Sequence, residues 1–273
     1  MGTKRFITAA LLASVMAMPS VAQINDDVND FGVWTSVGVE KKITKKWGAE
    51  IEGEFRTQDA LNDVARMSIG ISTDYKICSW LKADVGYVFL RDKNLAQFEE
   101  APIAEEDLGW IIQQGELTDA YWTNRHRVNA ALTGSVKIGR FKLSLRERWQ
   151  YTYRPESKKF ETDYVFYDPS LNVQPEIDGP KEKTVKEKHS HVLRSRLQVE
   201  YDIKGVPFEP YASVEMYNDF DGFKVNKIRY TIGGDYKIAK KHSIGLYYRY
   251  QDFPDSDKGE STHILGVGYK FKF

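Results

Sequence analysis

The sequence predicts an all-β protein, namely a transmembrane antiparallel up-and-down β-barrel with short periplasmic turns and long external loops. Apolar and polar residues alternate with a period of two along most of the chain, which places them on opposite faces of extended strands. The alternating segments are longer than the ~5–6 residues of ordinary globular strands. Short and long connections alternate between them, as they do in outer-membrane barrels.

The composition excludes several other classes of protein. The 273 residues include 39 Lys and Arg, 39 Asp and Glu, and a single Cys. Beyond the N-terminal region, no apolar run approaches the ~18 residues of a transmembrane helix. Balanced charge argues against a nucleic-acid partner, and one Cys supports neither an internal disulfide nor a thiolate-rich metal site. We therefore expect no nucleic acid, no metal and no cofactor.

Residues 1–22 are expected to be a cleaved export signal. Lys4 and Arg5 precede a short apolar stretch, and a small-x-small cleavage site ends at Ala22. No Cys follows the apolar stretch, so a lipoprotein anchor is not indicated. Residues 23–273 would then form a single domain in the outer membrane of a Gram-negative cell.

The segment 47–58 shows the strand pattern most clearly. A helix would scatter its glutamates, whereas an extended strand puts Glu50, Glu52 and Glu54 on one side. The same reasoning gives strands over 31–43, 47–58, 65–77, 81–91, 124–138, 141–154, 193–203, 208–217, 227–238, 243–250 and 265–273. No segment shows a credible helical period.

A soluble β-sandwich would also have one apolar and one polar face, but the connections favour a membrane barrel. The tight turns are 44–46, 78–80, 139–140, 204–207 and 239–241, and the connections between them include two long loops, 92–123 and 155–188. Aromatic residues of the apolar phase gather near both ends of the strands, as they do at the two membrane interfaces.

The C-terminal residues Tyr269, Phe271 and Phe273 resemble the aromatic last strand that the barrel-assembly machinery reads. We expect a monomer whose partners are outer-membrane lipid and, during biogenesis, this machinery.

The number of strands is ten to twelve, and twelve is favoured. The candidates above number eleven, and if Phe273 ends on the periplasmic side then Phe31 begins on the external side. Outer-membrane barrels of bacteria have an even number of strands as a rule. We therefore expect residues 23–30 either to thread the barrel or to pair as a short twelfth strand, or else the first strand to be irregular.

The run from Phe141 to Pro155, which contains the segment RERWQYTYRP, resembles the domain-of-unknown-function family 2490 (DUF2490), as do 193–197, 210–215 and 268–273. The resemblance covers essentially the whole chain after the export signal. It implies an uncharacterised outer-membrane barrel, chiefly of Bacteroidetes. It transfers no catalytic residue, because the family has none established.

Projecting the polar phases inward gives an acidic column on one strand and a basic cluster on three consecutive strands. This charge network comprises Glu50, Glu52, Glu54, Arg125, Arg127, Arg146, Arg148, Arg194, Arg196, Glu200 and Glu215. Side chains largely fill a barrel of this size, so buried charges are expected to pair. Alternatively, an arginine ladder selects an anionic solute, because guanidinium binds carboxylate and phosphate bidentately. We expect a non-enzymatic barrel, either structural or a narrow solute conduit.

An interfacial outer-membrane lipid hydrolase is the alternative function. The histidines fall on the apolar, outward phase, and Ser190 lies between His189 and His191. Such a site needs a nucleophile and a base within reach of each other. The other interpretation places these histidines in the aromatic belts.

Three further features carry weaker expectations. Glu147 is the one charge clearly on the lipid phase, and a β-bulge that turns it inward is expected. The acidic first loop predicts a negative external surface, with binding of divalent cations as the alternative. The aromatic second loop is expected to form a lid or a hairpin at the barrel mouth.

Overall fold

The computed structural model describes residues 29–104, 107, 110–254 and 261–273. The expected export signal lies outside these residues, so the structure does not test it. Within the described ranges, no helix is long and apolar enough to cross a membrane.

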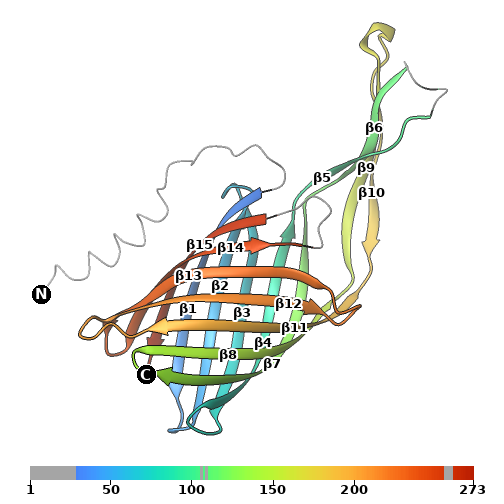
Figure 1. Ribbon diagram of the computed structural model, residues 1–273. Helices are drawn as coiled ribbons and strands as arrows, with labels where there is room; N and C mark the ends of the chain where they lie inside the picture. Colours follow the sequence, from blue (N-terminus) through green and yellow to red (C-terminus); the bar gives the residue numbers. More distant parts are fainter. Residues whose placement is uncertain (1–28, 105–106, 108–109, 255–260) are drawn as a thin grey trace, which may run out of the picture.

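Eleven strands form a closed barrel, in agreement with the predicted fold class (Figure 1). They are β1 (Asn29–Lys42), β2 (Trp47–Gln58), β3 (Asp63–Lys76), β4 (Leu81–Asn94), β7 (Tyr121–Ile138), β8 (Phe141–Arg154), β11 (Lys188–Tyr201), β12 (Phe208–Asp219), β13 (Val225–Ala239), β14 (His242–Asp252) and β15 (Ser261–Lys272). Each strand pairs with its neighbours in the order β1-β15-β14-β13-β12-β11-β8-β7-β4-β3-β2. We call the end with the tight turns the turn end and the opposite end the loop end.

The barrel closes with eleven strands, which lies within the expected ten to twelve but differs from the favoured twelve. The first and last strands pair in parallel, from Asn29 opposite Ser261 to Glu40 opposite Lys272, whereas all other neighbours are antiparallel. An odd number of alternating strands leaves the two closing strands pointing the same way, so a parallel seam is the only closure available. Asn29 and Asp30 belong to β1 and not to a twelfth strand.

The apolar phase faces outward along the whole barrel. The side chains of Val37, Ile69, Leu145, Leu197 and Ile232 are each more than half exposed, although a water-soluble protein would bury them. The polar phase faces the lumen, where Ser144, Gln150 and Glu215 are buried. An aqueous sandwich has the reverse arrangement, so this distribution of exposure fits a barrel surrounded by lipid.

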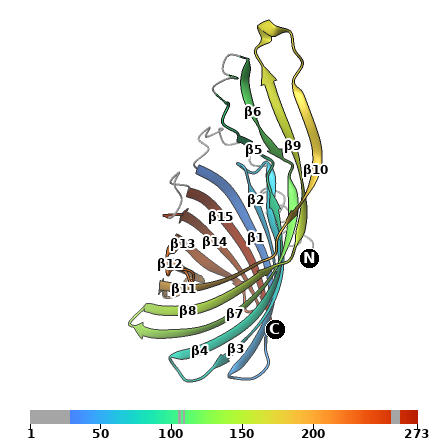
Figure 2. The ribbon, with the colours of Figure 1, turned by 90° about the vertical axis from the view of Figure 1, so that its right-hand side faces the viewer.

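The two long loops pair with each other and form a second sheet, which extends away from the loop end of the barrel (Figures 1 and 2). Its strands are β5 (Gln97–Glu100), β6 (Ile111–Thr118), β9 (Ser157–Tyr167) and β10 (Glu176–Val185), in the order β10-β9-β6-β5, and the short 3-10 turn η3 (Pro169–Leu171) lies between β9 and β10. We call it the outer sheet. The hairpin expected in the second loop is therefore present, but the strands of the first loop were not predicted.

One face of the outer sheet carries a row of carboxylates. Glu99, Glu116, Asp163 and Asp178 occupy directly paired positions on four successive strands. The ammonium group of Lys181 lies 2.9 Å from Asp163 and 2.5 Å from Asp178. Partial burial, together with neighbouring carboxylates, raises the pKa of Glu116 above its usual value. The outer sheet thus presents a negative strip that its own lysine neutralises only in part.

The direction of the two faces predicts the effect of adding charge to β12. We expect Val214→Arg, on the outward face near the middle of the strand, to lower the free energy of unfolding by about 2–4 kcal/mol. Ser213→Arg, which points into the polar lumen, should cost less. Urea titration of the protein refolded into lipid vesicles measures both, and a larger loss for Ser213→Arg would mean that the faces are assigned the wrong way round.

Candidate functional site

The strongest ion-pair cluster in the lumen is centred on Glu215 of β12. Its carboxylate accepts hydrogen bonds from Arg146 at 2.6 Å, from Arg194 at 3.0 Å and from the Tyr217 hydroxyl at 3.1 Å. The strands β8, β11 and β12 are neighbours, and their register places Arg196 directly between Arg146 and Glu215. The structure thus brings together three strands of the predicted network around one buried carboxylate.

Two other arginines of the basic cluster, Arg125 and Arg148, pair with carboxylates of β4. Asp92 lies 2.5 Å from Arg66 and 3.0 Å from Arg125, and Asp84 lies 3.3 Å from Arg148. Asp92 was expected in an external loop, but β4 continues to Asn94 and keeps this carboxylate inside the barrel. The buried guanidinium groups of Arg66 and Arg125 are stabilised by a carboxylate between them, and the additional residues of β4 supply it.

The acidic column of β2 does not neutralise the basic cluster. Glu50 lies 2.6 Å from Lys270 of β15, and Glu54 lies 2.6 Å from Arg56 of its own strand. Glu200 also pairs locally, 2.9 Å from Lys142. The predicted network is therefore several separate groups of charges and not one connected ladder.

A layer of stacked arginines and aromatic rings crosses the lumen in the half nearer the loop end. Its residues, which we call the arginine–aromatic layer, are Trp34, Arg56, Arg194, Tyr217, Arg229 and Arg249. The guanidinium carbons of Arg56, Arg249 and Arg229 lie 3.6, 5.0 and 5.2 Å from the centre of the Trp34 ring. A cation over an aromatic face is attracted by the ring quadrupole, more strongly when desolvated.

Sequence reasoning missed most of this layer, although one signal was available. Trp34 is a large apolar residue on the inward phase of β1, where Ser36, Gly38 and Glu40 follow it. Its side chain is buried, and Leu90, Thr123 and Ile264 are also almost completely buried in the same half of the barrel. An aromatic ring on a polar phase indicates a packed lumen and not a wide pore.

Several cations of this half have no carboxylate partner. Within the described ranges, no Asp or Glu lies at ion-pair distance from Arg127, Arg196, Arg229, Arg249 or Lys227. Arg127 donates to the Thr152 hydroxyl at 3.3 Å, Arg229 to the Gln251 carbonyl at 2.7 Å, and Arg249 to Thr231 at 3.0 Å. These neutral acceptors orient the guanidinium groups without cancelling their charge.

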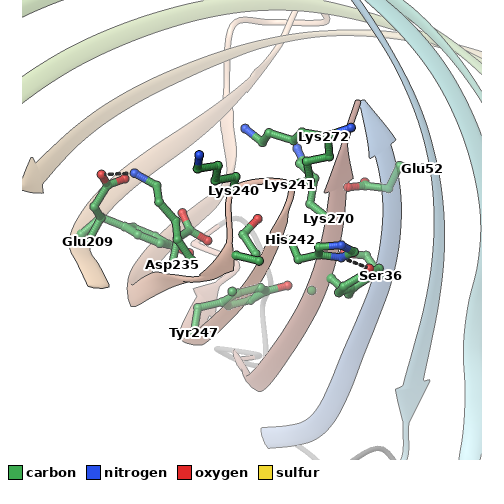
Figure 3. A pocket seen from close by; sticks show the side chains of 17 residues that line it. Ser36, Glu52, Glu209, Asp235, Lys240, Lys241, His242, Tyr247, Lys270 and Lys272 are labelled. Carbon is green, nitrogen blue, oxygen red and sulfur yellow. Dashed lines mark hydrogen bonds and ion pairs between the residues drawn. The ribbon is translucent and has the colours of Figure 1, made fainter. Parts of the chain in front are cut away.

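A cavity of about 340 Å³ occupies the lumen near the turn end (Figure 3). Small inward residues form one wall, among them Ser36 of β1, Gly245 of β14 and Gly268 of β15. Figure 3 shows Glu209 and Asp235 on one side of the cavity and Glu52 on the other. The space exists because these glycine and serine positions leave the lumen unfilled.

The cavity and the arginine–aromatic layer contain different cations. The described lining of the cavity has lysines such as Lys237, Lys270 and Lys272 and no arginine, whereas the layer is built on guanidinium groups, with Lys227 beside Tyr217. Lys237 lies 2.5 Å from Glu209, and Lys272 lies 3.1 Å from Glu40. Guanidinium is weakly hydrated and stacks on rings, while ammonium is strongly hydrated. The open cavity therefore carries the more strongly hydrated cation.

All the histidines lie on the outward face, and Ser190 does not. Four of them share a hydrogen bond between Nδ1 and a Tyr hydroxyl, namely His126 with Tyr87, His189 with Tyr151 and His263 with Tyr248, each at 2.7 Å, and His242 with Tyr269 at 2.6 Å. His191 stacks on Trp149, with ring centres 5.9 Å apart. Ser190 pairs in register with Thr152, which is buried in the lumen. The strand thus separates Ser190 from its neighbouring histidines, which belong to the aromatic belts.

Each of these tyrosines lies closer to the membrane centre than its histidine. The His is directly opposite a second aromatic residue two positions along from the Tyr, as His126 is opposite Phe89 and His242 opposite Phe271. A lipid-facing hydroxyl has no water to bond, so it needs a partner within the protein. The histidine supplies that partner from the interfacial side.

The bulge expected at Glu147 was wrong. β8 pairs with both neighbouring strands in continuous register, and Glu147 stays on the outward face, where it is exposed. The Ser195 hydroxyl of β11 donates to its Oε2 at 2.6 Å.

In the part of the chain that the structure describes, no three His, Cys, Asp or Glu side chains form a group that could hold a metal ion.

A family model described as "Protein of unknown function (DUF2490)" matches residues 31–262. The chain belongs to this family. The match runs from β1 to the start of β15, and this member of the family is an outer-membrane-type β-barrel whose function is unknown. A search of curated proteins gave no significant match.

Two solved structures of distant proteins are similar to this chain. The β domain of the Bordetella autotransporter Brka is 13% identical, with a TM-score of 0.52 over 83% of each chain. The translocator domain of the autotransporter NalP from Neisseria meningitidis is 11% identical, with a TM-score of 0.47 over 82% of this chain and 73% of that chain. At this identity the likeness to the Brka domain concerns the fold alone.

The packing of Trp34 predicts a large effect of removing it. We expect Trp34→Ala to lower the free energy of unfolding by about 3–5 kcal/mol, because it empties a buried site and removes the ring that three guanidinium groups share. Trp47→Ala is the control, because Trp47 is 47% exposed at the turn end. Denaturant titration in lipid vesicles compares the two, and an equal loss would show that Trp34 is not the centre of a packed layer.

Proposed function

We propose that the protein is a non-enzymatic outer-membrane barrel whose lumen binds and passes small anionic solutes. The observation that carries this proposal is the excess of positive charge in the lumen, where Arg127, Arg196, Arg229 and Arg249 have no carboxylate partner among the described residues. The outer sheet would face the cell exterior, and the turn end would face the periplasm.

Buried positive charge needs a counter-charge. Desolvating an isolated cation costs far more free energy than a folded protein can spare, so such groups pair with an anion or retain water. Guanidinium binds carboxylate and phosphate oxygens through two parallel hydrogen bonds, which a lysine does not do. Arg127 donates only to the Thr152 hydroxyl, and no ion pair is seen for Arg196 among the described residues. Both guanidinium groups would therefore bind a small carboxylate or phosphate.

The packing limits the size of the solute. Side chains largely fill barrels of this strand number, and the arginine–aromatic layer places rings and guanidinium groups across the lumen. The cavity beside Glu52 and Asp235 would act as a hydrated chamber on the periplasmic side. A solute passing the layer would exchange its water for guanidinium groups one after another.

The outward surface supports the location in the outer membrane. It is apolar at its centre and has tyrosine–histidine pairs towards both ends. The expected export signal at 1–22 and the aromatic C-terminal positions Tyr269, Phe271 and Phe273 agree with delivery to that membrane. The structural neighbours named above are domains of autotransporters, and their likeness supports the same fold.

A lipid hydrolase built on His189 and His191 has less support. Ser190 lies on the other face of the strand, and both histidines are engaged with aromatic side chains. If the purified protein released acyl chains from outer-membrane lipid and His191→Ala abolished this release, the hydrolase would be favoured over the anion conduit.

Conductance in planar bilayers tests the anion proposal. We expect a small conductance with preference for anions, and Arg196→Gln should reduce that preference several-fold because it removes an uncompensated charge. Lys45→Gln is the matched control, because this lysine lies in the exposed turn 44–46 and does not line the cavity, so its charge should matter little.

Two results would contradict this expectation. A cation preference in the unchanged protein would reverse the proposed selectivity. Complete absence of conductance, with no binding of phosphate or acetate detected by calorimetry, would leave a closed structural barrel as the better account.

A further inference from the structure

The pair Glu147 and Ser195 is a polar group in an otherwise apolar surface. Both side chains lie on the outward face near the middle of β8 and β11, and the Ser195 hydroxyl donates to Glu147 Oε2 at 2.6 Å. Leu145 and Leu197, which neighbour the pair on these strands, are 52% and 58% exposed. Among the described residues, Glu147 is the one charged side chain at the centre of the outward face.

The surface beside this pair is shallow. Leu132 of β7 is directly opposite Glu147, and the outward positions on either side of it are Ala130 and Gly134. A Cβ built on Gly134 meets no atom within 4 Å, so the space above it is open. Small residues at the surface of a membrane protein allow another backbone to approach closely.

Contact with lipid is energetically unfavourable for this patch. A charged side chain on the lipid face near the bilayer midplane costs on the order of 2–4 kcal/mol, and less when it is a carboxylate. The single hydrogen bond from Ser195 leaves further acceptor positions on Glu147 unfilled. Ionisable groups inside membranes accordingly mark contacts or functional sites.

We propose that the outward face of β7, β8 and β11 is the contact between two copies of this chain, with Glu147 and Ser195 at its centre. The proposal rests on the membrane location proposed above, and it replaces the monomer expected from the sequence. Each Glu147 would bond to Glu147 and Ser195 of the second copy.

Symmetry and chemistry both favour a second copy as the occupant. A two-fold axis along the membrane normal keeps every residue at its own depth, so Glu147 meets residues at the same depth of the other copy. Two carboxyl groups that meet in this contact would share one proton, because like charges so close together do not both ionise, and the Ser195 hydroxyl both donates and accepts a hydrogen bond. The patch can therefore form hydrogen bonds with a second copy of itself, whereas hydrocarbon forms none.

A nearby groove serves as a contrast within the same barrel. It has a volume of about 410 Å³ on the outward face of β11 to β14, and its lining includes Leu197, Val214, Tyr230, Ile232 and Tyr248. This lining is almost wholly apolar and suits a lipid chain. Of these two surfaces, only the one with Glu147 and Ser195 thus needs a polar partner.

Cysteine cross-linking in membranes tests the proposal. In a Cys78→Ser background of the full chain, Leu145→Cys should give a covalent dimer on mild oxidation. Val37→Cys is the control, because Val37 is 58% exposed on β1, on the opposite side of the barrel in the strand order. It should remain monomeric.

A second substitution tests the role of the carboxyl group. Added to Leu145→Cys, Glu147→Leu should lower the dimer yield about tenfold, which corresponds to ~1.4 kcal/mol of association free energy. Glu147→Gln keeps a donor and an acceptor and should retain most of the yield.

The outcomes separate this proposal from the membrane location on which it rests. A heat-dependent shift in gel mobility shows that each variant forms a folded barrel, and its absence would argue against the membrane barrel itself. If the folded Leu145→Cys protein does not cross-link, cross-links no better than Val37→Cys, or cross-links equally well with Glu147→Leu, then the contact between copies is refuted.

Discussion

Every backbone amide and carbonyl of a sheet in hydrocarbon must find its partner within the sheet, and this chain meets the requirement with a parallel seam between β1 and β15. Eleven strands that alternate in direction leave the two closing strands pointing the same way. The seam continues past the last strand, where the Phe273 amide donates to the Glu40 carbonyl at 3.0 Å. Parallel pairing is slightly weaker per residue than antiparallel pairing, so side chains next to the seam matter more than elsewhere.

The arginine–aromatic layer lies across this seam. Trp34 comes from β1, and its three guanidinium neighbours come from β2, β13 and β14, so that one ring joins strands on both sides of the closure. The same layer fills the lumen near the loop end, whereas glycine and serine on β1, β14 and β15 hollow it near the turn end. Closure and permeability thus depend on the inward residues of the same few strands.

The alternation of apolar and polar residues made the barrel strands and their two faces predictable from the sequence. Two-residue periodicity predicted the barrel strands and the direction of Glu215 and Leu145, because each strand must place one face in lipid. It could not predict the pairing of β6 with β9, since that contact joins two loops far apart in the chain. Nor could it show which charges meet: Glu54 pairs within its own strand, and Glu147 stays on the outward face, where Ser195 of the next strand donates one hydrogen bond to it. Such choices are made by register across strands, which a single strand's pattern does not contain.

The parallel seam also determines where the two ends of the folded chain lie. Asn29 is at the loop end and Phe273 at the turn end, separated by a strand of β1's length, about 45 Å at ~3.3 Å per residue. In a barrel with an even number of strands the ends emerge together and can be joined to make a circular permutant. Here a linker between them would have to span the whole length of the barrel, through the packed lumen or through the lipid, so a short linker cannot rotate the order of strands along this polypeptide.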